Sequence, residues 1–98
     1  MTDQLTIVDD PAQSQYVATL SGKEVAYIIY HRRTGIIDLQ HTIVDPSVGG
    51  KGVGTAIVRF ALDAARAAGD MVVPTCPMVA GFLERHPEYQ DLVKQAPA

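Results

Sequence analysis

The stretch VGGKGVGT, residues 48–55, separates two parts of this 98-residue chain whose residue patterns differ. Four glycines fall within residues 49–54, so the backbone there can turn tightly and be approached closely by another group. Several backbone N–H groups can then point to one place, beside the positive end of the helix expected to follow. We predict a site for a phosphate or pyrophosphate, with Lys51 adding a positive charge. The alternative is a turn that only begins a helix.

Two common phosphate-binding patterns do not match this stretch. In the P-loop pattern the lysine follows the last glycine, whereas Lys51 precedes Gly52 and Gly54. In the dinucleotide pattern a third glycine is required, and Thr55 or Ile57 stands in its place, depending on the starting glycine. A chain of this length is also too short for a doubly wound sheet.

The residues that follow the loop predict two helices and one short strand. From Gly52 the apolar and small residues recur at helical spacing as far as Ala68, and Gly69 with Asp70 should end this helix. Residues 71–73 are a short apolar run typical of a buried strand. A second helix is expected over residues 77–86, with Thr75 or Cys76 as its N-cap and Pro77 in its first turn. Residues 88–93 are expected to add a further turn or two.

The residues before the loop predict four strands, at 5–8, 16–20, 24–31 and 36–44, joined by short turns into an antiparallel meander. The helix would then cross over to a strand parallel to the fourth one. On the fourth strand, simple alternation places Leu39, His41 and Ile43 on one face and Asp38, Gln40 and Thr42 on the other. The predicted fold is α/β: a mixed, mainly antiparallel sheet of about five strands with a central crossover helix and a C-terminal helix. We expect residues 1–98 to form a single small domain.

Composition excludes several classes of function. Eight Lys and Arg against eleven Asp and Glu give a net charge of −3, which argues against nucleic acid as a partner. No apolar run approaches the ~20 residues needed to cross a membrane, and the first residues do not have the pattern of a signal peptide. One cysteine, Cys76, cannot form a disulfide within the chain or build a zinc site. A cytoplasmic protein without a metal is therefore expected.

Five ordered motifs resemble the GCN5-related N-acetyltransferases, and in particular the short single-domain branch of that family. They are HTIV at 41–44, the glycine loop, ALDAARAAG at 61–69, VVPTCP at 72–77 and HPEY at 86–89. In the family's loop pattern, Gly52 and Gly54 match the two small positions. Gly49 stands where the family has arginine or glutamine, so Lys51 is expected to supply the charge there.

The resemblance implies an N-acetyltransferase that uses acetyl-CoA. The amine of an unidentified acceptor, either a small molecule or a protein, would attack the thioester directly, and the protein would be a monomer or a weak homodimer. His41 and Cys76 would flank the thioester as catalytic residues. The residues implied to bind the cofactor are Ile43, Val44, Gly49, Gly50, Lys51, Gly52, Val53, Gly54, Thr55 and Cys76.

Other interpretations of the same residues remain open. Cys76 can be a small buried core residue, and His41 can be a packed strand residue. The chain can be a CoA-binding or acyl-CoA-binding module without turnover, or an acyl carrier or thioesterase that depends on Cys76. Residues 9–15 are too few for the helices that usually separate the first two strands in the larger family. We therefore expect an open or shallow acceptor site.

Overall fold

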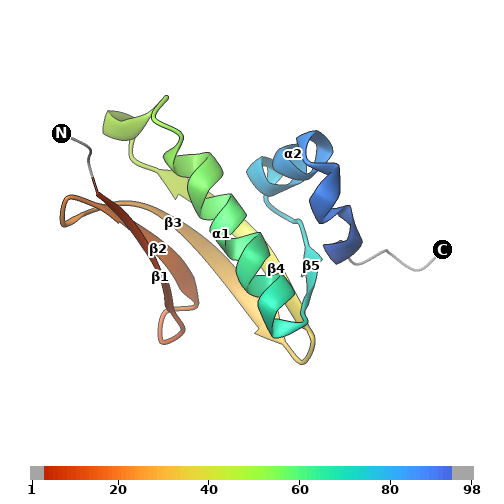
Figure 1. The fold of residues 1–98 in the computed structure, drawn as a ribbon. Coiled ribbons are helices and arrows are strands. Elements are labelled where there is room, and N and C mark those ends of the chain that lie inside the picture. The colour runs from red at the N-terminus through yellow and green to blue at the C-terminus, as the bar shows by residue number, and fades with distance from the viewer. Residues whose placement is uncertain (1–3, 94–98) are drawn as a thin grey trace.

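The structure, a computed structural model, describes residues 4–93 and contains one five-stranded sheet with the strand order β1-β2-β3-β4-β5 (Figure 1). The first four strands form the predicted antiparallel meander, and β5 pairs in parallel with β4. Residues 11–14 form only a turn between β1 and β2, as expected. The strands are β1 Leu5–Asp10, β2 Gln15–Leu20, β3 Lys23–Arg33, β4 Ile36–Val44 and β5 Met71–Val73.

Two α-helices and two short 3₁₀ helices complete the fold. Gly69 ends the first α-helix as predicted: it adopts a φ of +76°, and its N–H donates to the carbonyls of Ala65 and Arg66. Pro77 begins the second, where its missing N–H costs nothing. The elements are the 3₁₀ helices η1 Pro46–Val48 and η2 Pro87–Leu92, with α1 Val53–Ala68 and α2 Pro77–Arg85. No helix among residues 4–93 combines the length and apolar character that crossing a membrane requires.

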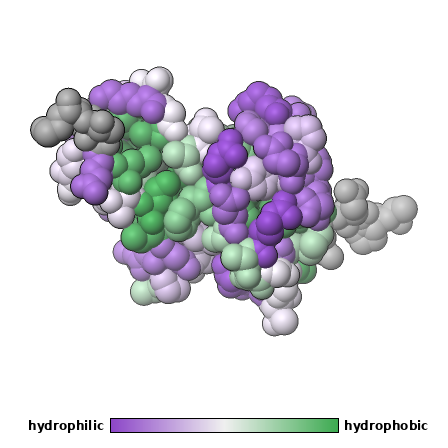
Figure 2. Space-filling model, in the orientation of Figure 1, coloured by the Kyte–Doolittle hydropathy of each residue, from purple (hydrophilic) through white to green (hydrophobic). Residues whose placement is uncertain are grey.

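Both α-helices pack on one face of the sheet, which we call the covered face. The apolar stripe of α1, including Ile57, Ala61 and Leu62, is fully buried there. Figure 2 shows hydrophobic side chains gathered on this side of the molecule over β1 and β2, beside the start of α1. Half-buried Ile7 of β1 and Phe60 of α1 line a hollow there, so α1 covers this part of the sheet incompletely.

A β-bulge in β4 makes one prediction wrong. Ile29 of β3 pairs with His41, but the next residue, Tyr30, pairs with Leu39, so Gln40 is the additional residue. Beyond the bulge, Thr42 continues the covered face on which Leu39 lies. His41 and Ile43 therefore do not share a face with Leu39, and both are exposed.

Candidate cofactor site

The glycine loop ends in a helix N-terminus that no side chain caps. Gly50 and Gly52 adopt φ values of +80° and +78°, a backbone conformation that other residues rarely adopt. Gly52 is the N-cap of α1 and offers no capping side chain, and the first turn contains no acid. The first bond of the helix runs from the Ala56 N–H to the Gly52 carbonyl at 3.0 Å. The N–H groups of residues 53–55 have no carbonyl four residues earlier within α1, and an anion can accept from them.

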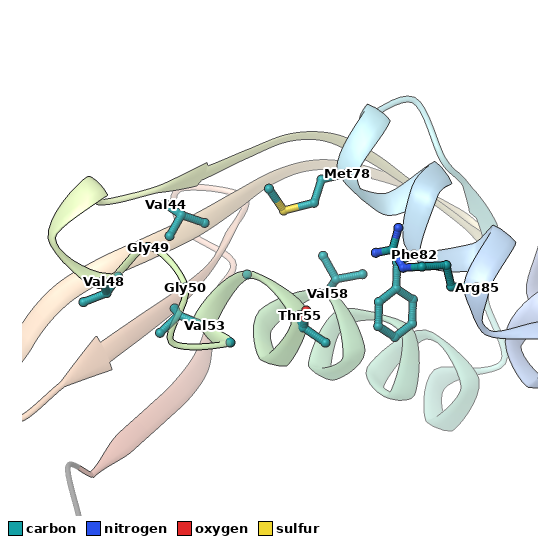
Figure 3. Close-up of a pocket in the computed structure, with 12 residues that line it drawn as sticks. Val44, Val48, Gly49, Gly50, Val53, Thr55, Val58, Met78, Phe82 and Arg85 are labelled. Atoms are coloured by element: carbon teal, nitrogen blue, oxygen red, sulfur yellow. The ribbon is translucent and has the colours of Figure 1, made fainter.

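A cavity of about 400 Å³ opens beside this helix N-terminus (Figure 3). The glycine loop and the first turns of α1 form one wall, and α2 forms the other. Arg85 is the one charged residue among the residues that line it, so the cavity favours a ligand that is anionic at some points and apolar at others. The lining residues are Val44, Val48, Gly49, Gly50, Gly52, Val53, Gly54, Thr55, Val58, Met78, Phe82 and Arg85.

Gly54 lies where α1 meets both α2 and the end of β4 beside this cavity. A Cβ atom built on Gly54 would lie 3.3 Å from Met78 Sδ and 3.5 Å from Val44 Cγ2. A side chain at this position would therefore enter the space between α1, β4 and α2. The absence of a side chain keeps the cavity open where it passes the end of β4.

The structure brings most of the predicted cofactor residues together but leaves four of the predicted site residues outside the cavity wall. Val44, Val53, Thr55 and the four glycines of the loop line it. Lys51 is exposed in the loop, and Cys76 is buried, with 3% of its surface exposed. His41 and Ile43 lie on the opposite face of the sheet, which we call the open face.

Strand β4 separates from the strand that follows α1 after only three paired residues. Met71–Val73 pairs with residues 36–38 of β4. The Cys76 N–H then donates to the Leu39 carbonyl at 2.9 Å, and the Thr75 hydroxyl donates to Asp38 Oδ1 at 2.5 Å. Within the part of the chain that the structure describes, no further strand pairs with residues 40–44 on this side. Their outward peptide groups are available to an extended ligand.

The thiol of Cys76 lies against this unpaired stretch. Its Sγ is 3.3 Å from Thr42 Oγ1, which lies on the covered face. Burial by itself would raise the pKa of Cys76, but the Thr42 hydroxyl and the Val79 and Met78 amides at the start of α2 favour the thiolate more strongly. The pKa of Cys76 is therefore below its ordinary value, as is typical of a thiol at a helix N-terminus.

The residues that α2 contributes to the cavity wall, and the contact of Thr42 with Cys76, are not evident from the sequence pattern. The helical pattern of residues 77–85 predicts a helix but not which of its faces meets a cavity. Phe82 stacks on His86 with ring centroids 3.9 Å apart, and the Arg59 guanidinium lies 5.3 Å from its centroid. These contacts hold the Phe82 ring in the cavity wall. Residues 4–93 contain no group of three His, Cys, Asp or Glu side chains able to hold a metal ion.

Comparisons with known proteins agree with this architecture. The family model described as GCN5-related N-acetyl-transferase matches residues 15–92. A GCN5-like protein from Staphylococcus aureus, solved by NMR, has a TM-score of 0.71 and 23% identity, with 95% of this chain and 91% of that chain covered. A crystal structure of a GCN5-related N-acetyltransferase from Sphaerobacter thermophilus has a TM-score of 0.53 and 18% identity, covering 76% of this chain and 28% of that one. The comparison with curated proteins found no match. With four fifths of its length matched, this chain belongs to the GCN5-related N-acetyltransferase family.

Proposed function

We propose that the protein transfers the acetyl group of acetyl-CoA to an amine. The observation that supports this most directly is the uncapped N-terminus of α1, which opens on a cavity beside the unpaired stretch of β4. An anion-binding helix end next to free strand peptide groups fits a ligand with a pyrophosphate at one point and an amide-containing arm at another. CoA has both parts.

Different residues of the site would bind the different parts of the cofactor. The amides of residues 53–55 would bind the pyrophosphate, and the glycine loop would allow it to lie close to the backbone. The pantetheine arm would extend past Val44 and Met78 to the unpaired stretch of β4, where its amides can pair with the strand. Lys51 and Arg85 would add positive charge near the phosphates.

The chemistry of transfer is a direct displacement. The lone pair of the amine nitrogen attacks the thioester carbonyl, a C–N bond forms, and the C–S bond breaks as the tetrahedral intermediate collapses. The products are an N-acetyl amide and CoA, whose sulfur leaves with the electron pair of the broken bond. The amine loses one proton, which His41 on the open face would accept. Cys76 on the covered face would border the acetyl group and its leaving sulfur.

The test of this proposal measures CoA release with a thiol reagent over a panel of amines, using Gly54→Ala and Gly81→Ala as a matched pair. Both glycines lie in helices, but a Cβ at Gly54 enters the cavity at 3.3 Å from Met78 Sδ. One at Gly81 would only touch Arg85 Nη1 at 3.5 Å, an ordinary contact distance that leaves this cavity-lining side chain in place. We expect Gly54→Ala to raise the KM for acetyl-CoA about tenfold or more, and Gly81→Ala to leave it near the original value. Equal effects in the two variants, or no turnover with any amine, would contradict the proposal.

Replacement of His41 gives a second test of the proposed function. Replacement of a general base is expected to lower kcat by about 10²-fold or more while the Kd for acetyl-CoA stays unchanged. His31 is a matched control, because it is also an exposed histidine of the same sheet. If His41→Ala and His31→Ala have the same activity, the proton leaves by another route.

A further inference from the structure

The open face of the sheet carries an apolar row that runs across four strands. The strand register places Val8 opposite Val17, Val17 opposite Tyr27, and Tyr27 opposite Ile43. Val8 and Ile43, at the two ends of the row, are 49% and 47% exposed. Large apolar side chains so exposed, and aligned by the sheet itself, form a surface suited to an apolar contact.

Two hollows lie along this row and share Glu24. One, of about 370 Å³, lies over β1 and β2 and is lined in part by Val8 and Val17. The other, of about 270 Å³, lies over β3 and β4 and is lined in part by Tyr27 and Ile43. Because Glu24 borders both, we treat them as one trough that follows the row. Three inter-strand spacings give a length of about 14 Å, which about five extended residues span.

The charged residues that line the trough are all acidic. Asp10, Glu24 and Asp45 line it with Asp9, and no Lys, Arg or His of the described chain does. The Asp9 carboxylate, however, accepts a hydrogen bond from the Tyr30 hydroxyl on the covered face, so the trough's own carboxylates are those of Asp10, Glu24 and Asp45. Lys23, which does not line the trough, lies 3.9 Å from Asp45 and offsets part of that charge, so Asp10 and Glu24 are its acidic groups without a cationic partner in the part of the chain that the structure describes. Among residues 4–93, Glu24 has neither a hydrogen bond nor an ion pair through its side chain. An occupant with apolar and cationic groups complements this surface.

The trough leads to the unpaired stretch of β4. Ile43 lies at its end, and His41 is two residues further along the same face, about 7 Å away. A ligand in the trough can therefore present an amine where acetyl transfer is proposed. A second copy of this chain is a poor occupant, because a two-fold contact over the row would bring like-charged carboxylates together.

We propose that the trough along Val8, Val17, Tyr27 and Ile43 binds an extended lysine-rich polypeptide segment, one of whose lysines is the acetyl acceptor. This inference rests on the proposed acetyltransferase function and names its substrate class. The apolar row would contact the aliphatic parts of the segment, and the carboxylates would bind its neighbouring lysines. The face is free for such a segment because no helix follows β1.

The first experiment measures binding without the cofactor. A synthetic peptide in which lysine alternates with alanine and valine is titrated into the ¹⁵N-labelled protein, and backbone amide shifts are followed by NMR. We expect the largest shifts at Val8, Val17, Tyr27 and Ile43. Absence of shifts at millimolar peptide, or shifts confined to the covered face, would overturn the inference.

The second experiment compares Glu24→Lys with Glu88→Lys, which makes the same change in net charge away from the trough. We expect Glu24→Lys to raise the KM for the peptide about tenfold, with kcat and the Kd for acetyl-CoA unchanged, and Glu88→Lys to stay near the original protein. Equal peptide KM values in the two variants, or spermidine used better than the peptide, would overturn the inference. If the unmodified protein does not bind acetyl-CoA, that result would instead contradict the proposed function itself.

Discussion

At the scale of single residues, the contact between Cys76 and Thr42 places a thiol against the unpaired stretch of β4. The thiol is buried, yet its sulfur lies 3.3 Å from a hydroxyl and at the start of α2. Burial disfavours a thiolate, whereas the hydroxyl and the amides of Met78 and Val79 stabilise it. Their combined effect lowers the pKa of Cys76, whose sulfur lies close to the proposed position of the thioester.

The pKa of Cys76 can be measured from thiolate absorbance at 240 nm, taken as the difference from the Cys76→Ser variant to remove the tyrosine signal. We expect a midpoint below that of an ordinary cysteine, and a higher midpoint in Thr42→Val, which keeps the shape but not the hydroxyl. Thr75→Val, which removes a neighbouring hydroxyl that bonds Asp38 instead, should leave the midpoint unchanged. A midpoint unaffected by Thr42→Val would show that this contact does not stabilise the thiolate.

The same shift makes a contribution to folding stability that depends on pH. Because the folded-state pKa lies below the unfolded one, ionisation of Cys76 favours the folded protein. The contribution is full above the unfolded-state pKa and is lost as the pH falls through the folded-state pKa. Relative to Cys76→Ser, the free energy of unfolding should therefore rise from neutral to alkaline pH, as measured by urea titration. If the difference in free energy of unfolding between the two proteins falls as the pH rises, the pKa of Cys76 is not lowered in the folded state.

At the scale of elements, the N-terminus of α1 depends on the backbone conformation of Gly52. Its φ of +78° costs a residue with a Cβ about 1 kcal/mol or more, so Gly52→Ala should lower the free energy of unfolding by about that amount. Gly54, inside the first turn, has no positive φ, and alanine there favours the helix. Urea denaturation should thus show loss of stability for Gly52→Ala but not for Gly54→Ala. The opposite order would contradict the loop geometry.

The start of β5 is held to β3 by an ion pair between a buried carboxylate and an exposed guanidinium. Arg32 Nη1 lies 2.8 Å from Asp70 Oδ2, and the Asp70 side chain is 8% exposed. Asp70→Asn is expected to cost about 1–3 kcal/mol, because a charge-assisted hydrogen bond to a buried carboxylate is replaced by one to a neutral amide. The surface pair of Arg66 and Asp91 has the same 2.8 Å separation, but Asp91 is 64% exposed, so Asp91→Asn should change the melting temperature little. Similar losses of stability in Asp70→Asn and Asp91→Asn would contradict the view that burial makes the first ion pair the stronger one.

Elements whose signals are local could be predicted from the sequence, and features that depend on pairing or packing could not. Glycine at 69 and proline at 77 mark helix ends by their own backbone properties, and both ends were predicted correctly. The bulge at Gln40 arises from the register between β3 and β4, which strand alternation does not contain. For the same reason His41 was predicted on the wrong face. The face of α2 that meets the cavity depends on its packing against α1, so Phe82 and Arg85 were missed.

At the scale of the whole molecule, the two faces of the sheet are proposed to bind different substrates. The covered face holds α1, α2 and the cavity proposed to bind the cofactor, and the open face holds His41 and the acidic trough. The unpaired stretch of β4 lies between them, so two substrates can approach one strand from opposite sides. The short turn between β1 and β2 leaves the open face accessible to a large acceptor.

The central claim is that the cavity beside the glycine loop binds acetyl-CoA, and calorimetric titration of the protein with acetyl-CoA tests it most directly. Desulfo-CoA and ADP serve as controls that lack the thioester and the pantetheine arm, respectively. We predict one site per chain for acetyl-CoA, weaker binding of ADP, and a loss of affinity in Gly54→Ala that Gly81→Ala does not show. The absence of binding at millimolar acetyl-CoA, or equal affinity in the two variants, would contradict the claim.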